Sequence, residues 1–123
     1  MASKKILFIE DENEIIGLMR TRLEASGYQM FSACDGEEGL RKVKVQRPNL
    51  ILLDIIMPKI DGLAVCRQLK GDLRTRNIPI IIVSACGDKD LFENCQQAGA
   101  DEVVIKPFEA EELLDKISKL LDK

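Results

Sequence analysis

Short apolar runs alternate with amphipathic stretches along the whole chain, and this alternation restricts the possible folds more than any other feature of the sequence. It predicts five strands, each followed by a helix. The expected strands are 5–9, 28–33, 50–53, 78–83 and 102–105, and the expected helices are 13–26, 35–46, 63–70, 90–97 and 109–121. Strands that alternate with helices form a parallel sheet covered on both faces. The continuously apolar run Leu50–Leu53 agrees, because such a strand has no polar side.

Turn and capping residues mark the expected ends of several elements. Gly27 is expected to end the first helix. Asp35 and Glu38 have the spacing of a capping box, and Asp61 is expected to cap the third helix. Pro79 lies near the start of a strand, where proline is tolerated. Because no repeat or linker interrupts the pattern, we predict one flavodoxin-like (βα)5 domain over residues 1–123, with strand order 2-1-3-4-5.

The length and charge of the chain restrict its possible partners. A chain of 123 residues is long enough for one domain with one core. Its net charge of −3 and pI of about 5.1 argue against direct binding to nucleic acid. Four basic residues lie in one short segment that also carries apolar side chains, and we interpret them as the solvated face of a helix: Arg41, Lys42, Lys44 and Arg47.

Several features favour a cytoplasmic protein with no membrane partner. No apolar run approaches the roughly 20 residues that a membrane-spanning helix needs. The first five residues lead directly into a strand, without the cleavage site of a signal peptide. The four cysteines are scattered and are interpreted as small buried side chains: Cys34, Cys66, Cys86 and Cys95. The chain has no histidine, which excludes histidine ligands and a histidine phosphodonor within it.

Polar residues follow the predicted strands, at the edge of the sheet where ligands bind in open α/β folds. The first strand ends in 10–12, which reads Glu-Asp-Glu, and the third ends in Asp54. The fourth ends in Ser84 and the fifth in Lys106. In the strand order 2-1-3-4-5 the first and third strands are neighbours. The carboxylates of Glu10, Asp11 and Asp54 are therefore expected to converge.

This convergence of carboxylates predicts a metal site. Two unit charges about 4 Å apart repel by roughly 4 kcal/mol at an effective dielectric constant near 20. Three carboxylates would therefore cost several kcal/mol, which is a large part of a domain's stability. A divalent cation offsets this repulsion, and oxygen ligands in an open, hydrated site favour Mg²⁺.

The ordered set of motifs resembles the receiver domain of two-component response regulators, over nearly the whole chain. The acidic pair of that family corresponds to Glu10 and Asp11, and its phosphoacceptor signature corresponds to 53–62. Its hydroxyl position corresponds to Ser84, and its Lys-Pro-Phe motif to 106–108. The resemblance implies a switch that accepts a phosphoryl group on Asp54 from a sensor histidine kinase or a phosphotransfer protein.

The resemblance also implies roles for the remaining site residues. Mg²⁺ or Mn²⁺ would be held by four groups: Glu10, Asp11, Asp54 and the backbone carbonyl of Ile56. Lys106 would pair with the phosphoryl oxygens, next to a cis peptide bond at Pro107. The Ser84 hydroxyl and the backbone amides of Ile56 and Ala85 would bind the phosphoryl group.

Two departures from the family pattern affect switching and phosphoryl lifetime. The position three residues before Lys106, often aromatic in the family, is Val103, so the signal is expected to travel mainly through loop movement. Ile56 and Cys86 stand two residues after Asp54 and Ser84, and neither can orient an attacking water. We therefore expect slow self-dephosphorylation. A redox-sensing role for Cys86 is a minor alternative.

Alternative functions remain within and outside this class. The chain could be a complete regulator or a receiver from a larger response regulator or hybrid kinase, and its start at Met1 favours an N-terminal position. Its target is expected to dock on the last two helices and the fifth strand, with the protein a monomer or a phosphorylation-dependent dimer. It is not expected to be an enzyme with a separate substrate. An aspartate-nucleophile phosphatase would need a second aspartate where Ile56 stands.

Overall fold

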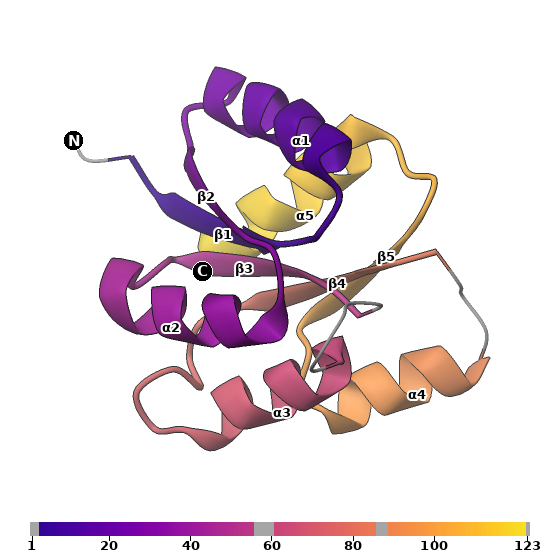
Figure 1. The fold of residues 1–123 in the computed structure, drawn as a ribbon. Coiled ribbons are helices and arrows are strands. Elements are labelled where there is room, and N and C mark those ends of the chain that lie inside the picture. The colour runs from indigo at the N-terminus through magenta and orange to yellow at the C-terminus, as the bar shows by residue number, and fades with distance from the viewer. Residues whose placement is uncertain (1–2, 56–60, 86–88, 123) are drawn as a thin grey trace.

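The computed structural model describes residues 3–55, 61–85 and 89–122, which contain five strands alternating with five helices (Figure 1). The strands are β1 (Lys5–Ile9), β2 (Gln29–Ala33), β3 (Leu50–Asp54), β4 (Ile80–Ser84) and β5 (Glu102–Ile105). The helices are α1 (Asn13–Ala25), α2 (Gly36–Gln46), α3 (Gly62–Gly71), α4 (Lys89–Gln97) and α5 (Ala110–Leu121).

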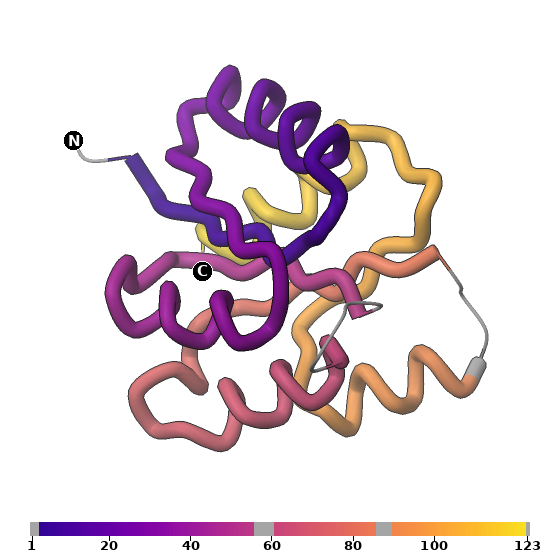
Figure 2. The backbone as a smooth tube through the Cα atoms, in the orientation of Figure 1, coloured from indigo at the N-terminus to yellow at the C-terminus, as the bar shows by residue number. Residues whose placement is uncertain are grey.

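The strands form one parallel sheet in the order β2-β1-β3-β4-β5, which confirms the predicted fold class and topology. Helices α1 and α5 cover one face of the sheet, and α2, α3 and α4 cover the other (Figures 1 and 2). In the register of β1 with β3, Ile9 lies beside Leu53. The residues that follow these two strands therefore emerge next to each other, at the carboxyl edge of the sheet.

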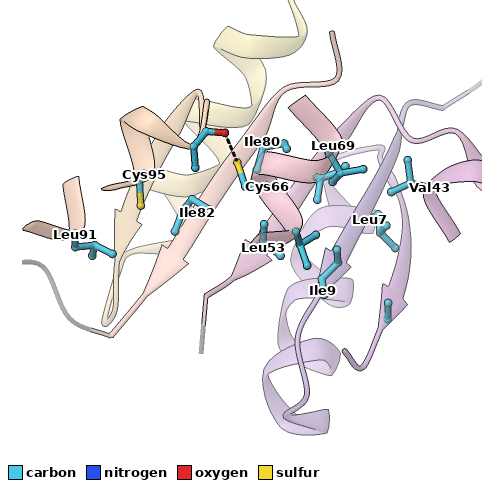
Figure 3. Packing of buried hydrophobic residues seen from close by; sticks show 14 residues of the cluster. Leu7, Ile9, Val43, Leu53, Cys66, Leu69, Ile80, Ile82, Leu91 and Cys95 are labelled. Carbon is cyan, nitrogen blue, oxygen red and sulfur yellow. Dashed lines mark hydrogen bonds between the residues drawn. The ribbon is translucent and has the colours of Figure 1, made fainter. Parts of the chain in front are cut away.

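The core has two sides because neighbouring residues of a strand point to opposite faces. In β1, Ile6 and Phe8 pack toward α1 and α5, whereas Leu7 and Ile9 pack toward α2, α3 and α4. All five residues of β3 and of β4 are buried. Figure 3 shows the second side, where the Cys66 thiol of α3 donates to the carbonyl of Ala98, next to Cys95. Cys66 and Cys95 are thus buried side chains, as predicted, whereas Cys34 is exposed, contrary to the prediction.

Two predicted helix caps can be compared with the structure. The Asp61 carboxylate accepts a hydrogen bond from the amide of Ala64 at 2.9 Å, which confirms its capping role for α3. The Asp35 carboxylate likewise accepts from the amide of Glu38 at 2.9 Å. In a capping box, Glu38 would accept from the amide of Asp35. It accepts instead from the amide of Cys34 at 2.6 Å, so this cap reaches one residue further back.

The start of β4 differs from the prediction by two residues. The amide of Ile78 donates to the carbonyl of Thr75 at 3.0 Å, which holds residue 78 in a turn. Pro79 has no amide hydrogen to donate to the sheet, although its carbonyl accepts from Ile51 at 2.9 Å. The strand therefore begins at Ile80. Across 3–55, 61–85 and 89–122, no helix has the length and apolar character needed to cross a membrane.

Candidate functional site

Two buried carboxylates stand at the carboxyl edge of the sheet. Asp54 is the last residue of β3 and pairs in register with Val83 of β4, so the sheet fixes its backbone. Glu10 follows β1, and its amide donates to the carbonyl of Ala33 at 2.9 Å. The Glu10 side chain is completely buried and that of Asp54 nearly so. Buried charges of one sign require a nearby cation.

Lys106, which follows β5, supplies that cation. Its Nζ lies 3.2 Å from Glu10 Oε1 and 3.3 Å from Asp54 Oδ2, so one ammonium group joins the ends of three strands. Its amide donates to the carbonyl of Ser84 at 2.6 Å, which ties the β5 end to the β4 end. The peptide bond between Lys106 and Pro107 is cis, as expected.

The electrostatics of this group show how strongly the three charges depend on one another. The pKa of Glu10 is raised from 4.5 to about 7, chiefly by burial and in part by the negative charge of Asp54, while the Glu12 amide and Lys106 oppose the change. Burial alone would lower the pKa of Lys106, but the carboxylates of Asp54 and Glu10 outweigh it and hold this pKa above its usual value.

The described residues include one group of acids that could hold a metal ion. Single carboxylate oxygens of Glu10, Asp11 and Glu12 lie within 4.8 Å of one another. Glu10 Oε2 accepts from the amides of Asp11 at 3.1 Å and Glu12 at 3.2 Å, so the backbone orients it. Asp11 and Glu12 are exposed, which leaves the group open to solvent. Hard oxygen donors at an open edge fit Mg²⁺, which keeps several of its waters.

This acid group differs in membership from the set predicted from sequence. Glu12 belongs to this group but was not among the predicted ligands. Its place in the same acidic tripeptide as Glu10 and Asp11 was the sequence feature that could have identified it. Asp54 is connected to the group through Lys106 and through its electrostatic coupling to Glu10.

The other predicted site residues lie at neighbouring strand ends or outside the described ranges. Ser84 is the last residue of β4 and is completely buried, beside Ile105 in the sheet register. Ala85 follows it and is exposed. The predictions for Ile56, as a metal ligand and as an amide donor, lie outside the described residues, as do residues 57–60 of the phosphoacceptor signature and Cys86.

Val103 lies on β5 and is partly buried. It packs against the core between the sheet and α2, α3 and α4. A short branched side chain fills this position, where the family pattern often has a ring.

A doubly wound parallel sheet with buried carboxylates and a lysine at its carboxyl edge is the arrangement of CheY-like receiver modules. Solved structures agree with this class. The receiver domain of sensor histidine kinase PA1611 from Pseudomonas aeruginosa, solved with magnesium coordinated in its active-site cleft, superposes with a TM-score of 0.91 at 30% identity, covering 99% of this chain and 100% of that one. The receiver domain of a histidine kinase from Syntrophus aciditrophicus gives 0.91 at 33% identity, with coverages of 98% and 91%.

The response regulator receiver domain model matches residues 6–118, and the chain therefore belongs to that family. Its curated relatives include the ycf27 protein of Cyanophora paradoxa, named for transcriptional regulation, at 42% identity over 96% of this chain and 48% of the relative. The alkaline phosphatase synthesis transcriptional regulatory protein PhoP of Bacillus subtilis is 37% identical, with coverages of 97% and 49%. The chain thus spans about half the length of these relatives.

The relatives also bear on the prediction that this protein has no nucleic-acid partner. RpaA of Synechocystis, 38% identical over 95% of this chain and 48% of its own length, is named as a DNA-binding transcriptional regulator. The prediction rested on the net charge of these 123 residues. These residues correspond to about half of the length of RpaA, so their charge says nothing about the other half of such a protein. The comparison therefore gives the prediction no support.

Proposed function

We propose that this receiver domain is a phosphorylation-operated switch in which Asp54 accepts a phosphoryl group from a sensor histidine kinase or a phosphotransfer protein. Receiver domains take phosphoryl groups from histidine kinases and act as signalling proteins, not as enzymes of the usual kind. The observation that carries the proposal is the position of Lys106 Nζ, 3.2 Å from Glu10 and 3.3 Å from Asp54. A carboxylate is a competent nucleophile for phosphoryl groups, and its transfer reaction depends mainly on positioning and charge neutralisation.

Each strand end would contribute one function. The Asp54 carboxylate, fixed by β3, attacks phosphorus and forms an acyl phosphate, while the donor histidine leaves with the electron pair of the broken P–N bond. Lys106 moves its hydrogen bonds from the two carboxylates to the phosphoryl oxygens. The Ser84 hydroxyl and the amides of Ala85 and Ile56 bind the remaining oxygens, so the loops after β3 and β4 are drawn inward.

Receiver domains bind Mg²⁺ at their acidic site, and the acid group of this chain fits that ion. We propose Glu10, Asp11, Asp54 and the carbonyl of Ile56 as its protein ligands, with Glu12 as an additional or water-mediated one, and Mn²⁺ as an alternative ion. The bound cation neutralises the charge that builds up on the phosphoryl oxygens. The chain's own residues position the acceptor oxygen and the lysine.

Transmission and partners follow from the same site. With Val103 in place of a ring, the inward movement of the loops would carry the signal to a target on α4, β5 and α5. The protein would act as a monomer or as a phosphorylation-dependent dimer. We propose a cytoplasmic location, which is typical of response regulators.

The curated relatives favour a receiver of a transcriptional regulator over one of a hybrid kinase, and DNA binding would then belong to the whole protein.

Intact mass after incubation with Mg²⁺ and acetyl phosphate tests the proposal. We expect one added phosphoryl group on the wild type and none on Asp54→Asn. Asp115→Asn, an equivalent change on exposed α5, should be phosphorylated normally. Omission of Mg²⁺ or addition of EDTA should abolish the adduct. An adduct that persists on Asp54→Asn would place the acceptor elsewhere, and no adduct with any donor would identify a receiver that does not use phosphorylation.

The lifetime of the adduct is a separate prediction. Neither Ile56 nor Cys86 carries a side chain that could orient water toward the acyl phosphate. We therefore expect the adduct to decay over minutes or longer after the donor is removed. Replacing Ile56 by Asn, whose side chain can hold a water, should shorten the lifetime of the adduct. Loss of the adduct within seconds in the wild type would contradict this prediction.

A further inference from the structure

Basic residues are concentrated on one part of this acidic domain. Segments 41–47 and 67–76 hold eight of the 18 lysines and arginines but only one of the 21 acidic residues, whereas the whole chain has a net charge of −3. The first segment belongs to α2, and the second covers the end of α3 and the turn that follows it. These two helices lie side by side on the same face of the sheet (Figure 1).

Most of these cations are exposed and form no salt bridge with any acidic residue that the structure describes. Lys42 pairs with Glu38, Lys70 with Asp101 and Arg74 with Asp72. In the described part of the chain, the other five are exposed and form no salt bridge: Arg41, Lys44, Arg47, Arg67 and Arg76. Their common charge remains uncompensated, and exposed like charges on neighbouring elements repel one another.

A groove of about 440 Å³ lies within this basic region. Lys44 and Arg47 line it from the α2 side, and Asp72 and Arg74 from the turn after α3. Its apolar lining residues are Val43, Pro48 and Ile78, and because the first two are buried and the third partly buried, we take them as an apolar floor. The Asp72–Arg74 pair is bidentate, at 3.2 and 3.0 Å, so Asp72 is already neutralised and the groove keeps a positive charge from Lys44 and Arg47.

Two large apolar side chains stand exposed beside this groove. Leu73, between the two groove residues Asp72 and Arg74, is 74% exposed, and Val45, next to Lys44, is 77% exposed. A second, shallower depression is lined by Leu73 and Arg67. It shares Asp72 and Arg74 with the groove, so the basic surface continues across α3. Arginine is enriched at protein interfaces, and exposed apolar patches bordered by polar residues mark interaction sites.

We propose that this basic groove is a docking site for an acidic amphipathic segment of a partner protein. Carboxylates of the segment would pair with Lys44, Arg47 and Arg67, while its aliphatic side chains would cover Leu73 and the apolar floor. The apolar floor favours a peptide over nucleic acid, because a phosphate backbone has no aliphatic groups to bury there. A second copy of this chain fits less well, because contact between unlike surfaces generates open chains instead of closed dimers.

The groove lies at the opposite edge of the sheet from Asp54. Pro48 and Ile78 precede β3 and β4, whereas Asp54 ends β3, and the strands are parallel. Docking here would therefore leave the phosphorylation site accessible and would not need phosphorylation. Such a surface could hold the domain in a complex while the opposite edge of the sheet switches.

Fluorescence anisotropy with labelled synthetic peptides tests this proposal at near-physiological salt. The probe is a short peptide of glutamate and leucine, compared with a glutamate–serine peptide of equal charge. We expect the leucine peptide to bind more tightly, and its affinity to fall about tenfold in Lys44→Glu and severalfold in Leu73→Ser. Lys119→Glu, the same charge reversal on exposed α5, and Asp54→Asn should bind like the wild type.

Four results would overturn the proposal. The first two are that the leucine peptide does not bind, or that both peptides bind equally well. The third is that Lys44→Glu and Lys119→Glu lose affinity to the same extent. The fourth is that duplex DNA binds more tightly than the peptide and that Lys44→Glu abolishes this binding. Sedimentation of the protein alone provides a further test. Self-association that Leu73→Ser removes would assign the surface to a second copy of this chain instead.

Discussion

At the scale of single residues, the site depends on one ammonium group shared by two buried acids. Lys106 approaches Glu10 and Asp54 at nearly equal distances, 3.2 and 3.3 Å. Neither contact alone neutralises the pair, because two carboxylates face one lysine. Burial and, after it, the negative charge of Asp54 raise the pKa of Glu10. The metal-free protein therefore gains stability from any change that removes one negative charge here.

Glu10→Gln tests this surplus charge through the pH dependence of stability. The Glu10 carboxyl has a pKa of about 7 in the folded protein, against an ordinary value of 4.5. Between these values the folded state binds more protons than the unfolded chain, so the free energy of unfolding falls as pH rises, by on the order of 3 kcal/mol in all. We expect Glu10→Gln to match the wild type near pH 5 and exceed it by on the order of 2 kcal/mol near pH 8, in urea unfolding with EDTA. Glu111→Gln, an exposed control on α5, should leave the free energy of unfolding unchanged at both pH values. A difference between Glu10→Gln and the wild type that does not depend on pH would contradict the raised pKa of Glu10.

Lys106→Met removes the shared cation and should have the opposite effect. Two acids would then be buried without the ammonium group that balances their charge, which is strongly destabilising. We expect a loss on the order of 2 kcal/mol near pH 8 in EDTA, and a smaller loss near pH 5, where Glu10 is protonated. Lys119→Met on exposed α5 is the matched control. The double variant with Glu10→Gln should recover most of the loss, and strict additivity of the two changes would show that the residues are not coupled.

At the scale of elements, the position of α3 behind Asp54 depends on a glycine at its first residue. A Cβ atom at Gly62 would lie 2.5 Å from the Cα of Ile55 and 2.6 Å from the carbonyl oxygen of Asp54. Both neighbours are backbone atoms and cannot move without shifting the end of β3. The close approach of α3 to the end of β3 thus fixes the backbone position of Asp54, the proposed acceptor.

Gly62→Ala should therefore destabilise the fold and disturb the site together. We expect a loss on the order of 2 kcal/mol in the free energy of unfolding, typical of overpacking, and a reduced rate of phosphorylation by acetyl phosphate. Gly71 ends the same helix, and a Cβ there would meet nothing within 4 Å. Gly71→Ala should leave both measurements unchanged or slightly improved. Equal behaviour of the two variants would show that the contact at Gly62 is relieved without cost.

The elements themselves were predictable from the sequence, and the reason is visible in particular residues. Periodicity and the glycine, proline and acidic caps locate the ten described elements, because each helix buries one side of a regular pattern and the central strands β3 and β4 are continuously apolar. The approach of Glu10 to Asp54 follows from the assumed strand order, whereas the role of Lys106 was implied only by the family resemblance. The start of β4 was not, because the turn at Ile78 depends on its bond to Thr75. The bond from Cys34 to Glu38 was missed likewise, since helix-cap geometry is set by distances that no spacing rule contains.

At the scale of the whole molecule, the two edges of the sheet carry different chemistry. The carboxyl edge gathers the acids and Lys106 of the proposed phosphorylation site. The other edge, near Pro48 and Ile78, carries the basic groove. This polarity was not apparent from net charge, because a value of −3 averages over both edges. It arises because parallel strands place all their amino ends on one side.

The proposed binding of Mg²⁺ would link the acidic edge to the stability of the whole domain. A ligand that binds only the folded state raises the free energy of unfolding by about 2.7 kcal/mol at 100 times its dissociation constant. For a domain of this size we expect an increase in melting temperature on the order of 10 °C under such saturation. The carboxylates must be deprotonated to bind the cation, and the pKa of Glu10 is about 7, so the increase should be larger near pH 8 than near pH 5.5. Asp11→Asn should lose most of it at both pH values, whereas Asp115→Asn should retain it. An equal increase in both variants would mean that the cation acts elsewhere on this acidic protein.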